Sequence, residues 1–249
     1  MRIYIFTIIT FLLSTQAINS QEVRSDNFIA FGANYGIDVP FGDMADRYGR
    51  NFHAGISIDL FRKKLNGIIS LEGSILFGDN VKEDVLSPLR LTNGSILGSD
   101  GAYVDVFLRQ RGTYLGIMVD KIIISNKSNK YSGLSIGGGL GIMQHNIRLN
   151  IDSNNAPQFD GDYQKGYDRN TLGLALKQKI GFINIGKTKS VNYEIALTIT
   201  EGFTKSTRGL DFDTMIKNNN SRIDILIGLD FKWMIPLSIQ GREEEEYFY

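Results

Sequence analysis

The stretch Asn27–Val39, NFIAFGANYGIDV, places apolar or aromatic residues at every second position, with small or polar residues between them. Successive side chains of a β-strand point to opposite faces, so Phe31, Tyr35 and Val39 share one apolar face of an extended chain. The same period of two recurs along the chain beyond Ser20. None of these segments holds the run of about 20 apolar residues that a membrane-spanning helix needs, so the pattern predicts strands.

Eight strands are expected from this pattern, at Asn27–Val39, Phe52–Leu60, Ile68–Phe77, Ala102–Ile124, Tyr131–Ile151, Arg169–Ile185, Asn192–Phe203 and Arg222–Ile235. The residues Pro40–Asp43 predict the end of the first strand. The alternation loses its phase near Arg109–Gly112, which predicts a β-bulge, and the register is expected to shift again at Met143–His145.

Short and long connections alternate between these strands. Short turns are expected at Arg62–Gly67, Asn126–Lys130 and Gly186–Val191, and longer loops at Pro40–Gly49, Gly78–Gly101, Asp152–Tyr167 and Lys205–Ser221. An even number of strands with this alternation predicts an all-β, eight-stranded antiparallel transmembrane β-barrel, an up-and-down meander of the OmpA/OmpX type in the outer membrane of a Gram-negative cell. The short turns and both termini are then expected in the periplasm. The sheet must close, because lipid offers no partner to the backbone of an open edge.

The polar face of the strands carries many charges, namely Asp59, Glu72, Lys177, Lys179, Glu194, Asp230 and Lys232. An eight-stranded barrel is just wide enough inside for its own side chains, so we expect a lumen filled by paired charges and not a pore. The alternative is a water-soluble barrel or sandwich with its apolar faces inward. Tyr193 and Trp233 beside the apolar bands are typical of aromatic girdles and favour contact with outer-membrane lipids.

The N-terminal segment Met1–Ser20 has the layout of a secretory signal, with Arg2, the apolar run Ile3–Leu13 and a zone of small residues. Cleavage after Ala17 and after Ser20 both fit, and a retained anchor is the alternative. We expect three parts: a signal peptide at 1–20, a barrel at 21–239 and a periplasmic tail at 240–249. The chain has no cysteine, so no disulfide stabilises it.

Composition and motifs restrict the function classes. The chain has 27 basic and 27 acidic residues, which argues against nucleic acid as a partner. His53 and His145 are the only two histidines, and a barrel-embedded lipid-modifying enzyme would need one of them as its base. His53 shares a strand face with Ser57 and Asp59. Polar residues that merely fill the lumen are the favoured interpretation, so we predict no enzyme, no catalytic residue and no cofactor.

Two further patterns have simple interpretations. The run Gly137–Gly141 does not open a helix within a βαβ unit, so it favours close strand approach over nucleotide binding. Asp152–Asn154 and Asp160–Asp162 offer oxygen ligands to Ca²⁺ but lack the spacing of an EF-hand, and no metal site is expected.

The C-terminal tail combines four acidic with three aromatic residues: Glu243, Glu244, Glu245, Glu246, Tyr247, Phe248 and Tyr249. A run of like charges is usually solvated. The aromatic end makes the tail a candidate contact for a periplasmic partner, and a disordered tail is the alternative.

Several motifs together resemble the PorG-type small outer-membrane barrels associated with type IX secretion and gliding motility. They are Gly141–Arg148, Lys165–Arg169, Gly202–Thr204, Asp211–Thr214, Arg222–Asp224, Trp233–Pro236 and Glu246–Tyr249. The resemblance implies a non-enzymatic component of a protein secretion complex that contacts the lipoprotein and partner subunits of a periplasmic ring. The ring contact would fall on the periplasmic turns and on Gln240–Tyr249.

The matching segments in or beside the external loops supply a candidate loop cluster, made up of Lys165, Tyr167, Asp168, Arg169, Phe203, Asp213 and Arg222. We expect these loops to pack on one another, with ion pairs among Asp168, Arg169, Asp213 and Arg222. A surface adhesin or ligand-binding barrel that works through Gly78–Gly101 and Lys205–Ser221 remains an alternative function.

Overall fold

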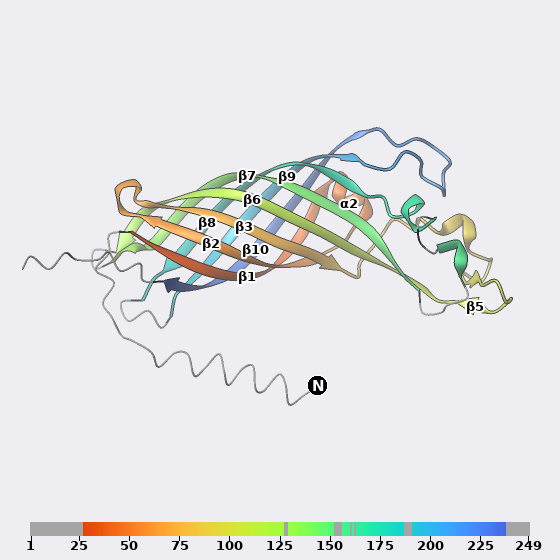
Figure 1. Ribbon diagram of the computed structural model, residues 1–249, viewed down its shortest axis with the longest axis horizontal. Helices are drawn as coiled ribbons and strands as arrows, with labels where there is room; N and C mark the ends of the chain where they lie inside the picture. Colours follow the sequence, from red (N-terminus) through yellow and green to blue (C-terminus); the bar gives the residue numbers. More distant parts are fainter. Residues whose placement is uncertain are drawn as a thin grey trace, which may run out of the picture.

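The computed structural model describes residues 27–126, 129–151, 156–159, 161, 163–186 and 191–237. Eight strands close into one antiparallel barrel in the order β1-β10-β9-β8-β7-β6-β3-β2 (Figure 1). They are β1 (Asn27–Gly42), β2 (Asn51–Arg62), β3 (Gly67–Gly78), β6 (Val106–Asn126), β7 (Asn129–Ile151), β8 (Thr171–Asn184), β9 (Tyr193–Ser206) and β10 (Ser221–Leu237). The predicted eight-stranded meander is confirmed.

One end of the barrel carries the short connections, and we call it the turn end. β2 and β3 are joined there through the 3-10 turn η2 (Lys63–Leu65) and Asn66, whose φ of 45° suits an Asn-Gly turn. Asn27 pairs with Arg62, and Ile29 pairs with Leu237. Both ends of the described barrel therefore lie at the turn end. The signal and tail expected at 1–20 and 240–249 lie outside the described residues.

The opposite end carries the long loops, and we call their described residues, 43–50, 79–105, 156–170 and 207–220, the cap. Its short elements are α2 (Asp43–Arg47), η3 (Ser87–Leu89), β4 (Ile96–Leu97), β5 (Tyr103–Val104), η4 (Pro157–Phe159) and η5 (Tyr163–Gly166). β4 and β5 form a small separate sheet, so the fourth barrel strand begins at Val106 and not at Ala102. Figure 1 shows this cap extending beyond the barrel wall.

Apolar side chains cover the outside of the barrel. Ile56 is 72% exposed, and Leu140 and Leu174 are each 70% exposed. The side chains that alternate with them along each strand point into the lumen. An apolar surface that runs around a whole barrel would aggregate in water, whereas hydrocarbon satisfies it. The chain is therefore a transmembrane barrel. Among the described residues, no helix has the length and hydropathy needed to cross a bilayer.

The predicted bulge near Arg109–Gly112 is wrong. β6 pairs with β7 without interruption from Val106 to Ile122, and the register shifts only beside the turn, between Ile122 and Ile124 and between Ser125 and Asn126. The alternation loses its phase because the outward face of β6 becomes polar at Arg111 and Arg109, toward the cap. A rule that equates outward with apolar fails where a strand leaves the hydrocarbon layer.

The predicted register shift at Met143–His145 is also wrong, for the converse reason. β7 keeps its pairing with both neighbours through these residues. Met143, Ile147 and Leu149 point inward and are buried in the apolar core beneath the cap. The inward face of β7 thus becomes apolar while its outward face becomes polar.

β1 also continues further than expected, through Pro40 to Gly42. The pairing of β1 with β2 ends at Asp38, so Pro40 is flanked only by β10, where it lies opposite Leu226. Proline is tolerated in a strand with one unpaired side. The proline therefore marks an edge and not a strand end.

Two apolar clusters close the ends of the lumen. At the turn end, Phe28 stacks on Phe61 with ring centroids 4.2 Å apart, among Ala30, Ile68, Ile183, Ile185 and Met234. At the cap end, side chains of the strands pack against Met44, Tyr48, Val85, Leu86 and Phe159 of the cap. The charged residues occupy the space between these clusters.

Candidate functional site

The middle of the lumen holds a continuous network of ion pairs. Lys179 Nζ lies 2.9 Å from Asp120 Oδ2 and 2.8 Å from Glu194 Oε1. Lys232 Nζ lies 2.9 Å from Glu194 Oε2 and 3.3 Å from Asp59 Oδ1. Glu194 therefore bridges two lysines, and each of the five side chains is buried. Charges enclosed in this way are tolerated because each has an opposite partner.

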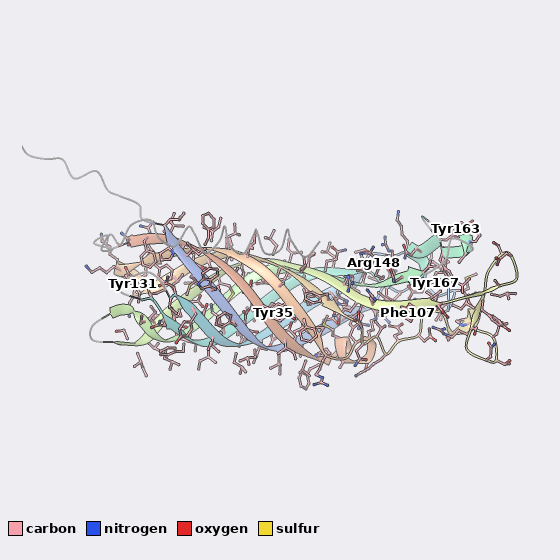
Figure 2. All side chains as sticks on the ribbon, turned by 90° about the horizontal axis from the view of Figure 1, so that it is seen from below. Tyr35, Phe107, Tyr131, Arg148, Tyr163 and Tyr167 are labelled. Carbon is pink, nitrogen blue, oxygen red and sulfur yellow. The ribbon has the colours of Figure 1, made fainter. Side chains whose placement is uncertain are left out.

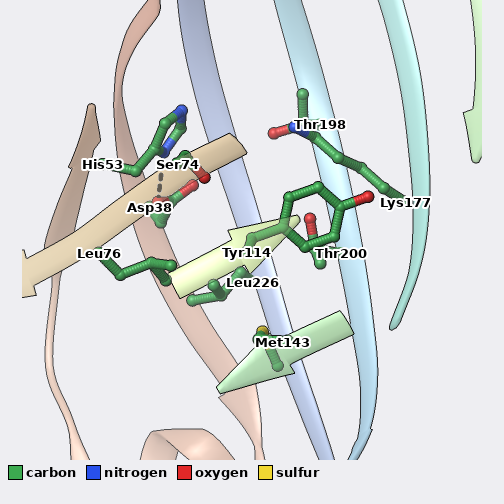
Figure 3. Close-up of a pocket in the computed structure, with 10 residues that line it drawn as sticks. All are labelled: Asp38, His53, Ser74, Leu76, Tyr114, Met143, Lys177, Thr198, Thr200 and Leu226. Atoms are coloured by element: carbon green, nitrogen blue, oxygen red, sulfur yellow. Dashed lines mark hydrogen bonds and ion pairs between the residues drawn. The ribbon is translucent and has the colours of Figure 1, made fainter. Parts of the chain in front are cut away.

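A second ion pair blocks the lumen nearer the cap. Lys177 Nζ lies 2.7 Å from Glu72 Oε1 and 5.2 Å from the centre of the Tyr114 ring. Figure 3 shows the space around it, with Lys177 and Tyr114 facing His53 and Asp38 across the lumen. Two cavities in this region have volumes of about 20 and 10 Å³. Each has room for one water molecule, and the ion pairs of Lys177, Lys179 and Lys232 cross the space between the strands, so the described side chains fill this part of the lumen.

The glycine run predicted to permit close strand approach has this role in the lumen. A Cβ atom added at Gly137 would overlap the carboxylate of Asp120, and one at Gly139 would overlap Met118. Gly138, which points outward, has only the carbonyl of Lys177 nearby, at 3.8 Å. The inward glycines therefore make room for the side chains of β6.

His53 is not arranged as a catalytic base for Ser57. Its Nδ1 lies 2.7 Å from Asp38 Oδ2 and its Nε2 lies 3.1 Å from Asp230 Oδ2. Ser57 instead donates a hydrogen bond to Asp59 at 3.0 Å. A nucleophile and its base must share a hydrogen bond, so this trio lacks the required geometry. His53 joins β2 to β1 and β10 across the lumen.

His145 is enclosed beneath the cap. Its Nε2 lies 2.9 Å from Asp224 Oδ2 and 2.9 Å from the hydroxyl of Thr171, and its Nδ1 lies 3.3 Å from the hydroxyl of Tyr48. The side chain has no exposed surface. No substrate can reach it in this conformation, so its contacts are structural.

The cap contains its own charged cluster, centred on Arg169. The Arg169 guanidinium lies 2.7 Å from Glu83, 2.5 Å from Asp213 and 3.2 Å from Asp211, and its side chain is 5% exposed. Arg47 pairs with the same Glu83 at 2.9 Å and donates to the Arg169 carbonyl at 3.2 Å. This cluster, the Arg169 cluster, joins α2 and the loops 79–105, 156–170 and 207–220.

Arg169 has both a shifted pKa and an unusual backbone conformation. Burial alone would lower the pKa of Arg169, but hydrogen bonds to Asp213 and Glu83 outweigh burial and raise the pKa above its ordinary value. Its φ of 50° lies in the left-handed region, which is costly for a side chain other than glycine. The surrounding ion pairs offset that cost and hold the backbone in place.

The other charged residues of the candidate loop cluster have different partners. Asp168 accepts hydrogen bonds from both Nε and Nη2 of Arg208, which raise the pKa of Arg208. Arg222 donates to the Asp43 carbonyl at 2.5 Å and lies 3.4 Å from Asp224. The cluster expected among Asp168, Arg169, Asp213 and Arg222 is thus brought together only in the pair Arg169–Asp213.

The remaining candidates divide between the cap and the barrel wall. Tyr167 packs edge-on between Phe159 and Phe212, with ring centroids 5.9 and 5.8 Å away. Lys165 is exposed on η5. Phe203 is 54% exposed on the outward face of β9, so it belongs to the membrane surface and not to the cap.

The candidate loop cluster left out four residues that complete the cap, namely Arg47, Glu83, Arg208 and Asp211. They come from three loops, and no periodicity links them to Arg169. Tail residues Glu243–Tyr249, and the oxygen ligands at Asp152–Asn154, Asp160 and Asp162, lie outside the described residues. In the part of the chain that is described, no group of three or more His, Cys, Asp or Glu side chains could hold a metal ion.

No protein-family model matches the sequence, and no curated protein matches it. Among solved structures, the chain is similar to Ail, the attachment invasion locus protein of Yersinia pestis, with 10% identity and a TM-score of 0.42 over 84% of this chain and 99% of Ail. It is also similar to Neisserial surface protein A, with 8% identity and a TM-score of 0.41 over 82% of this chain and 96% of that one. At these identities and TM-scores the likenesses concern shape alone.

Proposed function

We propose that the protein is a non-enzymatic outer-membrane barrel that acts as an anchoring component of a type IX protein secretion complex. The observation that carries the proposal is the filled lumen, in which Lys179, Glu194 and Lys232 occupy the space between the strands. A barrel whose lumen is filled would act by binding partners at its turn end or at its cap. The secretion role is supported by the resemblance of the loop and C-terminal motifs to those of PorG-type barrels.

The proposed orientation follows from the lengths of the connections. Short turns of bacterial barrels face the periplasm and longer loops face the exterior. The turn end would then lie in the periplasm together with Glu243–Tyr249, where subunits of a periplasmic ring could bind, and the cap would lie outside the cell. An acidic tail suits a basic surface on the partner.

Affinity purification from solubilised membranes tests the periplasmic contact. The full chain is compared with a chain lacking Gln240–Tyr249 and with one in which Glu243–Glu246 are replaced by glutamine. We expect ring subunits with the full chain and a large loss with both variants. A Met215→Ser variant in the cap serves as the control and should recover as much as the full chain. Recovery of no ring subunit with any version would overturn the proposal.

A second candidate function, binding of a ligand at the cell surface, is favoured by one observation. The cap exposes apolar side chains beyond the barrel wall, including Tyr103 at 66%, Tyr163 at 65% and Met215 at 73%. Figure 2 shows Tyr163 at the far end of the molecule from Tyr131. Adhesion of cells that carry Tyr103→Ser and Tyr163→Ser, measured beside cargo secretion, separates the two functions. Loss of adhesion with normal secretion would favour the surface role.

A further inference from the structure

Three arginines gather on the outside of the barrel where β6 and β7 approach the cap. Arg109 and Arg148 lie directly opposite each other in the antiparallel pair, and Arg111 is opposite Asn146 on the same outward face. Directly opposite side chains of such a pair have Cβ atoms about 5 Å apart, and diagonal neighbours lie about 7–8 Å apart. The three guanidinium groups therefore form one patch, which we call the arginine patch.

The arginine patch holds more positive than negative charge. Its one described acidic contact is Asp79, whose Oδ1 lies 3.4 Å from Arg109 Nε and whose side chain is 81% exposed. Arg111 donates to the Gln110 carbonyl at 2.7 Å, and Arg148 is exposed. Neither of these two has an acidic partner among the residues that the structure describes. Like charges directly opposite each other destabilise a strand pair, so the arrangement favours a bound anion.

A groove with two kinds of lining lies beside these arginines. It has a volume of about 570 Å³, and its outward residues include Arg111, Thr113, Gln144, Asn146 and Arg148 on one side and the apolar Ile75 and Phe77 of β3 on the other. The polar residues can hold a headgroup, and the apolar ones can contact acyl chains. A soluble anion would need only the first group.

The depth of the arginine patch suits a lipid headgroup. Along β7 the outward residues change from Leu140 and Ile142 to Gln144, Asn146 and Arg148. Along β6 they change at the same level, from Leu115 to Thr113, Arg111 and Arg109. Successive outward residues lie about 6.6 Å apart along a strand, so Arg111 is two such steps from Leu115 and lies in the zone above the hydrocarbon layer. Figure 2 likewise shows Arg148 between Tyr35 on the barrel wall and Tyr163 in the cap.

The same rim is apolar on the other side of the barrel. Phe41, Phe203 and Ile223 point outward near the cap end of β1, β9 and β10. On these three strands Lys205 of β9 is the one outward basic residue near the cap, so the positive charge is greatest on the pair β6 and β7. A local patch of this kind selects a ligand, whereas a uniform girdle only positions the barrel.

We propose that the arginine patch binds the phosphate groups of a phosphorylated glycolipid of the outer leaflet, with the acyl chains of that lipid running past Ile75 onto the apolar pair Leu115 and Ile142. Guanidinium groups bind phosphate through paired, charge-assisted hydrogen bonds. The proposal relies on the orientation proposed above, with the cap outside the cell, but not on the secretion role.

The test uses the purified full-length protein in phosphatidylcholine nanodiscs that contain either diphosphorylated lipid A or the same lipid with its phosphates removed. Lipid retained after detergent extraction is counted by native mass spectrometry. We expect the phosphorylated lipid to bind at least about tenfold more tightly, and the variant Arg111→Gln/Arg148→Gln to lose about tenfold for each arginine removed. The matched control is Lys121→Gln. Lys121 is an exposed, outward lysine at the turn end of β6, the strand that carries Arg111.

Three results would overturn the proposal: equal retention of the two lipids, equal loss with Lys121→Gln, or binding of inorganic phosphate without retention of the lipid. Misfolding does not confuse the outcome, because the substituted side chains point outward. In nanodiscs without lipid A, the Arg148→Gln variant should be as stable as the native protein or more so, since it removes one of two opposed charges. The assay contains no secretion partner, so a failure here leaves the anchoring function to its own experiment.

Discussion

The lumen and the cap each bury a charged cluster, but the two clusters are built differently. In the lumen, Lys179, Glu194 and Lys232 come from consecutive strands whose register is set by the barrel ladder. In the cap, Arg169 and Glu83 come from separate loops that no strand ladder aligns, and their ion pair is one of the contacts that join these loops. The lumen cluster therefore depends on a framework that exists without it, whereas the cap cluster is part of what holds its loops together. Variants should affect global stability in the first case and local order in the second.

The largest effect is expected from Glu194→Ala. The change leaves Lys179 with only Asp120, and Lys232 with only Asp59, in a space without bulk water. Breaking a buried ion pair from one side costs about 3–5 kcal/mol. Urea unfolding in lipid vesicles, followed by Trp233 fluorescence, measures the loss. Glu201→Ala, on the outward face of the same strand, is the control. If both variants unfolded at the same urea concentration, the lumen network would not support the barrel.

The next largest effect is expected from arginine placed on the outward face of a strand, compared with arginine placed in a loop. Leu197 points outward midway along β9, and its replacement by arginine should cost about 2–4 kcal/mol. Ile225 also points outward but lies nearer the cap end of β10, so Ile225→Arg should cost less. Asn219→Arg in the exposed loop should leave stability nearly unchanged. The same urea titration ranks all three, and equal tolerance would contradict the outward phase of β9 and β10.

A smaller effect is expected from the inward glycines. Gly137→Ala forces the Asp120 carboxylate away from its position near Lys179 and should cost about 1–3 kcal/mol, as overpacking does. Gly138→Ala, one residue away and facing outward, should be neutral within about 0.5 kcal/mol. Unfolding midpoints of the two variants give the comparison. A neutral Gly137→Ala would mean that the lumen has spare space there.

The smallest change in global stability is expected from Arg169→Met, with the largest change in the cap. Without the guanidinium, Glu83, Asp211 and Asp213 repel one another and the loops separate. Limited proteolysis of the protein in vesicles should cut the loop 207–220 faster, while the urea midpoint shifts less than for Glu194→Ala. Lys217→Met in the same loop is the control. An unfolding shift as large as that of Glu194→Ala would show that cap and barrel unfold as one unit.

The same contrast explains how far sequence reasoning reaches. The lumen residues Lys179 and Glu194 could be predicted, because a period of two assigns every strand residue to one face. The partners of Arg169 could not, because loop residues have no period, and Glu83 is brought near only by the folded cap. Of the four charges expected to meet, only Arg169 and Asp213 do so.

The two misplaced irregularities in β6 and β7 have one physical cause. The alternation rule assumes that outward means apolar, which holds only within the hydrocarbon layer. Arg111 points outward beyond that layer, and Met143 points inward beneath the cap. A reversal of polarity between the faces therefore marks a membrane boundary, even where the backbone continues unchanged.

The seam of the barrel has a consequence for biogenesis. Ile29 pairs with Leu237 and Gly42 with Asp224, so the first strand exported must wait for the last before its ladder is complete. Until then, two rows of backbone amides and carbonyls stay open to any other extended chain. A copy that ends prematurely, before Ser221, lacks β10 and cannot close its sheet. Its open edges would find no hydrogen-bond partners in lipid, so it should not insert stably into the bilayer.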